Sequence, residues 1–147
     1  MPFVVDNSIV VGWHLDNQAT PYSDEVLNAL AGDTGHVPAL WALEFSNVVR
    51  KALLAKKITE TRAREIMQIQ ASLALTVHGD IPVAAENMAL ALRYRLSSYD
   101  AAYLDLALRL RLPMATADRA LHDASVAAGV GAFTPSHARG NVHEQIA

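Results

Sequence analysis

The stretch "FVVDNSIVVG", residues 3–12, has the pattern of the first strand of a core, and the aspartate Asp6 ends its first apolar run. Residues 2–6 are short, rich in β-branched side chains and without polar alternation, which predicts a buried strand. Asn7 or Ser8 is expected to cap the helix that follows. A buried carboxylate is costly unless something pairs with it, so Asp6 requires a partner from elsewhere in the chain.

The totals are those of one domain with a real core. The chain has 147 residues, 52% of them apolar, a formal net charge of -3 and no cysteine, which is compatible with a reducing compartment. We expect a single domain over 1–135 and a mobile tail over 136–147, where apolar residues are few. The sequence has neither a signal-peptide pattern nor an apolar run of about 20 residues, so a cytoplasmic protein without membrane contact is expected.

Outward from the first strand, predicted strands and helices alternate along the chain. Strands are expected at 2–6, 36–40, 74–78, 114–118 and 129–133, and helices at 7–13, 20–32, 39–56, 59–73, 82–96, 98–110 and 119–129. Such alternation favours parallel pairing with helices on both faces of the sheet. The prediction is a three-layer α/β/α fold around a central, mostly parallel sheet of about five short strands.

Four carboxylates fall at predicted ends of these elements. Asp6 and Asp118 follow predicted strands, Asp100 lies in the first turn of a predicted helix, and Glu44 lies early in the helix after "HVP". In an open parallel sheet, ligands gather beyond the carboxyl ends of the strands. All four side chains are therefore expected at the same edge of the sheet.

Each carboxylate also has an ordinary structural interpretation. Asp6 or Asp118 alone is typical of a helix cap or a turn, and Asp100 is typical of a first-turn partner of the helix dipole. Glu44 is harder to explain by solvation, because it shares a helical stripe with Leu40 and Val48, although a salt-bridged glutamate stays open.

The four together indicate a metal ion. Carboxylates on one edge repel one another at low dielectric, so they either share protons or hold a hard cation. Mg²⁺ (or Mn²⁺) prefers oxygen ligands and can activate water, and it neutralises a phosphate that an acidic pocket would repel. The sequence thus predicts phosphodiester hydrolysis.

The segments "VVDNS" (4–8), "PALWALEFSNVV" (38–49), "SYDAAYLDLA" (98–107) and "ATAD" (115–118) resemble those of PIN-domain ribonucleases, particularly VapC-like toxins of toxin–antitoxin pairs. The resemblance runs in order along nearly the whole chain. It implies a PIN-like fold, Mg²⁺-dependent endoribonuclease activity and a homodimer. It also implies a small antitoxin partner whose C-terminal segment occupies the active-site groove, and products with 5′-phosphate and 3′-hydroxyl ends.

The resemblance also implies roles for individual residues. The catalytic set is Asp6, Glu44, Asp100 and Asp118, with the metal on Asp6, Asp100 and Asp118. Glu44 helps to place the metal or accepts the proton of water. Ser8, Asn47 and Thr116 are supporting residues; Ser8 and Thr116 alternatively serve as a helix cap and a strand-end turn. Asp105 is expected to be peripheral, because five residues after Asp100 correspond to about 140° around a helix.

Half of the Lys and Arg residues gather between 50 and 64, namely Arg50, Lys51, Lys56, Lys57, Arg62 and Arg64. This cluster is either a phosphate-contacting arm or a solvated helix connection. The candidates for RNA contact are Lys51, Lys56, Lys57 and Arg119. Tyr99, Tyr103, Trp13 and Trp41 could stack on bases but at helical spacing are more typical of core or dimer contacts.

Three alternative functions fit the sequence less well. A phosphoacceptor switch domain needs a lysine at a late strand end, and "MATAD" (114–118) has none. A haloacid-dehalogenase-type phosphatase needs an acid two residues after Asp6, where Ser8 stands. A non-catalytic PIN-like RNA- or protein-binding module would be favoured by an incomplete acidic set, but the set is complete. The six histidines form no i, i+4 pair, and His137 and His143 are given no ligand role.

Overall fold

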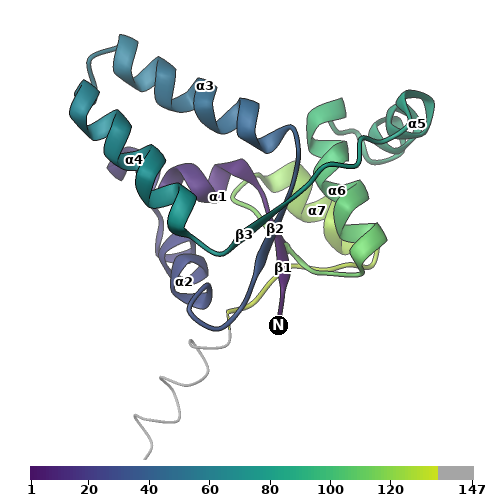
Figure 1. Ribbon diagram of the computed structural model, residues 1–147. Coiled ribbons are helices and arrows are strands. Elements are labelled where there is room, and N and C mark those ends of the chain that lie inside the picture. Colours follow the sequence, from purple (N-terminus) through teal and green to yellow (C-terminus); the bar gives the residue numbers. More distant parts are fainter. Residues whose placement is uncertain (136–147) are drawn as a thin grey trace, which may run out of the picture.

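The computed structural model describes residues 1–135; the predicted mobile tail, 136–147, lies outside the described residues. The described residues form a parallel sheet of four strands in the order β3-β2-β1-β4 (Figure 1). The strands are β1 Phe3–Val5, β2 Gly35–Pro38, β3 Leu75–His78 and β4 Met114–Ala115. Because β1 pairs with β2 on one side and β4 on the other, the residue that follows β1 emerges at the middle of the sheet edge.

Helices cover the sheet on both sides (Figure 1). The elements are α1 Asn7–Gly12, the 3₁₀ helix η1 Asp16–Gln18, α2 Pro21–Ala29, α3 Trp41–Leu54, α4 Glu60–Ser72, α5 Ala84–Tyr94, α6 Ser98–Leu110 and α7 Arg119–Ala127. Helices α1 to α4 lie to one side of the strands and α5 to α7 to the other. The predicted three-layer α/β fold is confirmed.

The core is built around β1. Phe3, Val4 and Val5 have no exposed surface, and Phe3 stacks on Phe133 with ring centroids 4.0 Å apart. Each such side chain stabilises the fold by about 2 kcal/mol relative to an exposed position. The strand that leads to Asp6 is therefore firmly held.

The fifth predicted strand, 129–133, is reduced to a single bridge between Met114 and Ala132. Gly129 and Gly131 have φ values of +91° and +78°, in the region that side chains other than glycine rarely adopt. These two residues interrupt the extended backbone that a strand needs, so the sheet has one strand fewer than the pattern suggests.

Side-chain caps fix where two helices of interest begin. Ser97 accepts a hydrogen bond from the backbone N–H of Asp100 at 3.1 Å and starts α6. Asp118 Oδ1 accepts from the backbone N–H of Leu121 at 2.9 Å and starts α7. A cap of this kind stabilises a helix by about 1 kcal/mol. The first turns of both helices are thus held at the carboxyl edge of the sheet. Within 1–135, no helix has the length and apolar character needed to cross a membrane.

Candidate active site

The structure brings the four predicted carboxylates together at the carboxyl edge of the sheet. Asp6 follows β1, Asp118 follows β4, and Glu44 and Asp100 lie in the first turns of α3 and α6. Their charges act on one another: Asp6 and Asp118 each raise the pKa of Asp100, and Asp6 and Asp100 each raise the pKa of Glu44. Side chains separated by up to 112 positions in the sequence therefore share one electrostatic environment.

Hydroxyl groups hold the buried carboxylate of Asp6. Its Oδ2 accepts hydrogen bonds from Ser8 Oγ at 2.6 Å and from Thr116 Oγ1 at 2.9 Å. The same two hydroxyl oxygens accept from the backbone N–H groups of Ala117 and Asp118, both at 3.0 Å. This network ties the end of β1 to the turn between β4 and α7.

Ser8 is not the cap of α1. The N-cap residue is Asp6, whose backbone carbonyl accepts from the N–H groups of Ile9 and Val10. The prediction of Asn7 or Ser8 as the cap was therefore wrong, because the side chain of Ser8 donates to Asp6 Oδ2. Thr116 likewise contacts the acidic group in addition to its place in the strand-end turn.

Burial and mutual repulsion raise the pKa of three members of the cluster. Removal from water is the largest cause for Asp6, whose pKa is raised although hydrogen bonds from Ser8 and Thr116 act in the opposite direction. Burial, then repulsion from Asp6 and Asp118, raises the pKa of Asp100 to about 6. Burial is also the largest cause of the raised pKa of Glu44. The cluster carries its negative charge at a cost that a proton or a cation would relieve.

Sequence reasoning missed one member of the site. Tyr103, which has no exposed surface, donates a hydrogen bond from its hydroxyl to Glu44 Oε1 at 2.7 Å. The sequence pattern placed Tyr103 only among core or stacking aromatics. Its position three residues after Asp100, one turn along the same helix face, was the available signal.

The donor set fits a hard divalent cation in chemistry and charge, since it consists of carboxylate oxygens in a partly buried acidic pocket. In the described part of the chain, however, no three His, Cys, Asp or Glu side chains already stand close enough together to hold an ion. Asp6 is buried, Asp100 is partly buried and Asp118 is exposed. These three are the residues that would hold such an ion.

Asn47, the third predicted supporting residue, lies on the surface beside Glu44. Asn47 lines a shallow surface hollow together with Glu44, and its Oδ1 accepts from Arg50 at 3.4 Å. Asp105 forms an ion pair with Arg109 at 2.9 Å, in agreement with a peripheral position.

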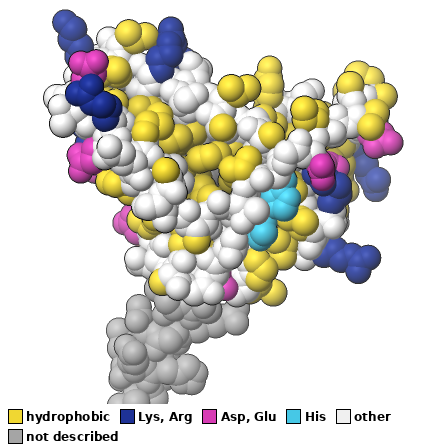
Figure 2. All heavy atoms as spheres, viewed as in Figure 1, with side chains coloured by type: hydrophobic (Ala, Val, Ile, Leu, Met, Phe, Trp, Pro, Cys, Tyr) yellow, Lys and Arg dark blue, Asp and Glu magenta, His cyan; other side chains and the backbone are white. Residues whose placement is uncertain are grey.

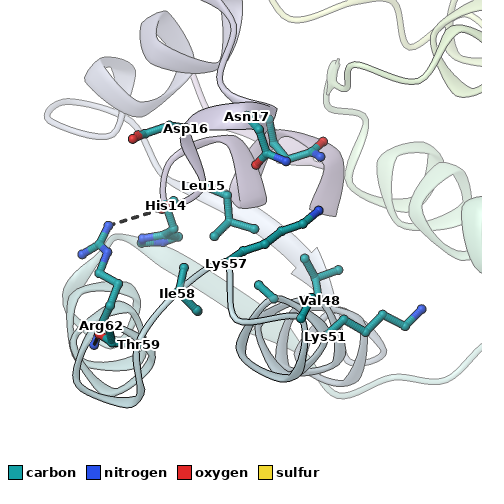
Figure 3. A pocket seen from close by; sticks show the side chains of 13 residues that line it. His14, Leu15, Asp16, Asn17, Val48, Lys51, Lys57, Ile58, Thr59 and Arg62 are labelled. Atoms are coloured by element: carbon teal, nitrogen blue, oxygen red, sulfur yellow. Dashed lines mark hydrogen bonds between the residues drawn. The ribbon is translucent and has the colours of Figure 1, made fainter.

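The basic residues are divided between a cavity and the open surface. Lys51 and Lys57 line a cavity of about 860 Å³ between the α1–η1 segment and the α3–α4 pair (Figure 3). Arg62 lines it too and donates to the backbone carbonyl of His14 at 3.3 Å. Figure 2 shows further Lys and Arg side chains at the far end of α3 and α4. Lys56 is exposed there.

Arg119 faces solvent. Its side chain is 91% exposed and lies 3.7 Å from that of Asp123, which is also on the surface. The structure therefore brings Lys51 and Lys57 to one cavity but leaves Arg119 apart from it, beside Asp118 in the sequence.

The fold is that of an α/β protein with a parallel sheet, and four carboxylates gather at the edge where the parallel strands end. The family model described as "PIN domain" matches residues 3–127. This chain belongs to the PIN-domain family, whose members are generally nucleases that use divalent metal ions and often bind RNA and antitoxins.

A solved structure supports the same fold. The crystal structure of PAE2754 from Pyrobaculum aerophilum is similar, with a TM-score of 0.63 and 19% sequence identity over 98% of this chain and 96% of that chain. At this identity the likeness concerns the fold alone. No match was found among the curated proteins.

Proposed function

We propose that this protein is a metal-dependent endoribonuclease and the toxin of a toxin–antitoxin pair. The observation that carries the proposal is the convergence of Asp6, Glu44, Asp100 and Asp118 at the carboxyl edge of the sheet, with raised pKa values for the first three. An acidic cluster of this kind repels RNA unless a cation balances it, which is the reason for a metal-dependent mechanism.

In this mechanism Asp6, Asp100 and Asp118 would hold Mg²⁺ or Mn²⁺. When bound, the ion would lower the pKa of a coordinated water molecule and neutralise charge on the phosphate. Ser8 and Thr116 keep Asp6 in place through their hydrogen bonds. Glu44, whose pKa is raised in part by Asp6 and Asp100, would help to place the ion or accept the proton of the attacking water. In-line attack would leave 5′-phosphate and 3′-hydroxyl ends.

The basic residues of α3 and α4 favour a nucleic acid as the substrate. Glu44 lies in the first turn of α3, and Lys51 lies seven residues later, two turns along the same face. Lys51 and Lys57 line the adjacent cavity (Figure 3), where they would contact phosphates that flank the cleaved bond.

An apolar groove on the surface favours binding of a protein partner. For a toxin this partner would be the antitoxin. It has a volume of about 350 Å³ and lies between α3, α4 and β3, with Phe45, Met67 and Val77 among its lining residues. Hydrophobic side chains are visible in this region of Figure 2. Two other lining residues, Trp41 and Gln70, have buried side-chain N–H groups that find no hydrogen-bond partner within residues 1–135.

Exposed apolar side chains on α5 support the proposal of a homodimer. Met88 and Leu92, one turn apart, are 57% and 71% exposed. Ala85 and Ala89 are also exposed and complete an i, i+3, i+4, i+7 stripe. Such an apolar stripe on the surface is typical of a contact between subunits.

The test is incubation of the purified protein with total cellular RNA, in Mg²⁺ and in chelator, followed by mapping of the fragment ends. We expect cleavage in Mg²⁺ only. Asp6→Asn should reduce the rate by about 10²- to 10³-fold, the order of a lost electrostatic contribution to the transition state. Its melting temperature in chelator should not fall, because one member of a repelling cluster is neutralised.

Two results would count against the proposal. Equal cleavage in chelator would exclude a metal-dependent reaction. RNA binding without any cleavage, in Mg²⁺ and in Mn²⁺, would favour the alternative of a non-catalytic PIN-like binding module.

A further inference from the structure

Tyr103 lies between two elements of the acidic site. Its ring is fully buried, and its hydroxyl donates to Glu44 Oε1 at 2.7 Å. The backbone N–H of Asn7, the residue after Asp6, lies against the same phenolic oxygen. One side chain of α6 thus contacts a carboxylate of α3 and the start of α1.

The hydroxyl has a purpose that packing alone does not explain. Phenylalanine would fill the same volume without bringing a polar group into the core, and a buried tyrosine hydroxyl requires a partner. Here the partner is a carboxylate that faces Asp6 and Asp100. The hydrogen bond is therefore directed at the acidic site.

The donor is also of a particular chemical kind. Ser8, Thr116 and Tyr103, which hold Asp6 and Glu44, are all neutral hydroxyl groups. A lysine or arginine in any of these places would fix the carboxylate but cancel its charge, and would compete with a cation. Neutral donors fix the orientation and preserve the negative charge.

A glutamate needs such a donor more than an aspartate does. Glu44 is only partly buried, and its long side chain loses rotamer freedom when it is held in one orientation. Tyr103 lies one turn after Asp100 on the same helix, so the placement of α6 sets both a candidate ligand and the orientation of Glu44 from α3.

We infer that Tyr103 is a positioning residue, whose hydroxyl orients Glu44 toward the ion held by the acidic cluster. This inference rests on the proposed function, because it concerns the same site. It assigns to Tyr103 no contact with RNA and no transfer of a proton.

The test compares Tyr103→Phe with the matched variant Tyr99→Phe. Tyr99 lies on the same helix and is 66% exposed. Binding of Mn²⁺ is followed by the loss of the electron paramagnetic resonance signal of free Mn²⁺. We expect Tyr103→Phe to weaken Mn²⁺ binding about tenfold, the usual effect of removing a residue that orients a ligand, and Tyr99→Phe to leave it unchanged.

A double-mutant cycle with Glu44→Ala, which removes the acceptor, separates positioning from packing. If the hydroxyl acts through Glu44, then Tyr103→Phe has no further effect on Mn²⁺ affinity once Glu44→Ala is present. The same loss of affinity in both backgrounds would mean that Tyr103 supports the site only by packing, and would overturn the inference. Unchanged Mn²⁺ affinity in Tyr103→Phe alone would overturn it as well.

The binding measurement also keeps the two proposals apart. If the wild-type protein binds Mn²⁺ with the expected cycle but cleaves no RNA, the endoribonuclease proposal fails and the role of Tyr103 stands. If the wild-type protein cleaves RNA and the cycle shows no coupling, the proposed function stands and the role of Tyr103 fails. A wild-type protein that binds no Mn²⁺ contradicts both.

Discussion

At the scale of single residues, one side chain can serve a structural and an electrostatic purpose together. Asp118 caps α7 through Oδ1, and its negative charge helps to raise the pKa values of Asp6 and Asp100. The sequence offered the cap and the acidic cluster as alternatives, whereas the structure has both. The hydroxyls of Ser8 and Thr116 fall at predicted supporting positions, but no pattern in the sequence predicted the hydrogen bond from Tyr103 to Glu44.

The raised pKa of Asp100 predicts a pH dependence of stability in the metal-free protein. The folded-state value is about 6 and the ordinary value is 3.8, so the folded protein binds this proton at higher pH than the unfolded chain does. The free energy of unfolding should therefore rise as pH falls from about 6 to 4. At pH 7 the destabilisation caused by the ionised Asp100 is fully present. After a discount for partial exposure, we expect a difference of about 1 kcal/mol.

The measurement is urea unfolding in chelator from pH 4 to pH 7. Asp100→Asn should be more stable than the wild-type protein at pH 7 and should have a flatter pH profile. Asp6 and Glu44, whose pKa values are also raised, would keep part of the slope. Asp105→Asn, which changes a carboxylate paired with Arg109, is the control and should not flatten the profile. A wild-type stability that increases with pH across this window would contradict the prediction.

At the scale of elements, local signals predicted most helices and the parallel character of the sheet. Thr20, Thr59 and Ser97 start α2, α4 and α6, and these caps are readable in the sequence. The 3₁₀ helix Asp16–Gln18 was not predicted, because three residues are too few for a periodic pattern. The predicted strand at 129–133 is reduced to one bridge. Its apolar residues suggested a strand, but Gly129 and Gly131 adopt positive φ.

The end of the α3–α4 pair is the element expected to contact phosphates. Lys57 lines the cavity (Figure 3). Lys56 is exposed. Replacing both by Ala should weaken RNA binding more at low salt than at high salt. The slope of log K against log salt should fall by about 1 to 2.

Fluorescence anisotropy with labelled RNA, in chelator to prevent cleavage, measures this slope. Replacement of Arg93 and Arg95, which are exposed at the end of α5, by Ala is a control of equal charge. An equal loss of affinity at all salt concentrations, or the same loss in the control, would argue against phosphate contact by Lys56 and Lys57.

At the scale of the whole molecule, the order of the strands creates the candidate site. β1 lies between β2 and β4, so Asp6 emerges between the start of α3 and the turn that carries Asp118. The sequence predicted a common sheet edge, because parallel strands end together. It did not predict which strands are neighbours, since nothing in a local pattern records their order. The proximity of the four acids depended on that order.

If these distant acids share one divalent ion, an anomalous difference map from a crystal grown with Mn²⁺ should locate it. We expect a peak within coordination distance of an Asp6 oxygen and of an oxygen from Asp100 or Asp118. Well-ordered carboxylates with no peak between them at saturating Mn²⁺, or a peak only at a site remote from Asp6, would contradict it.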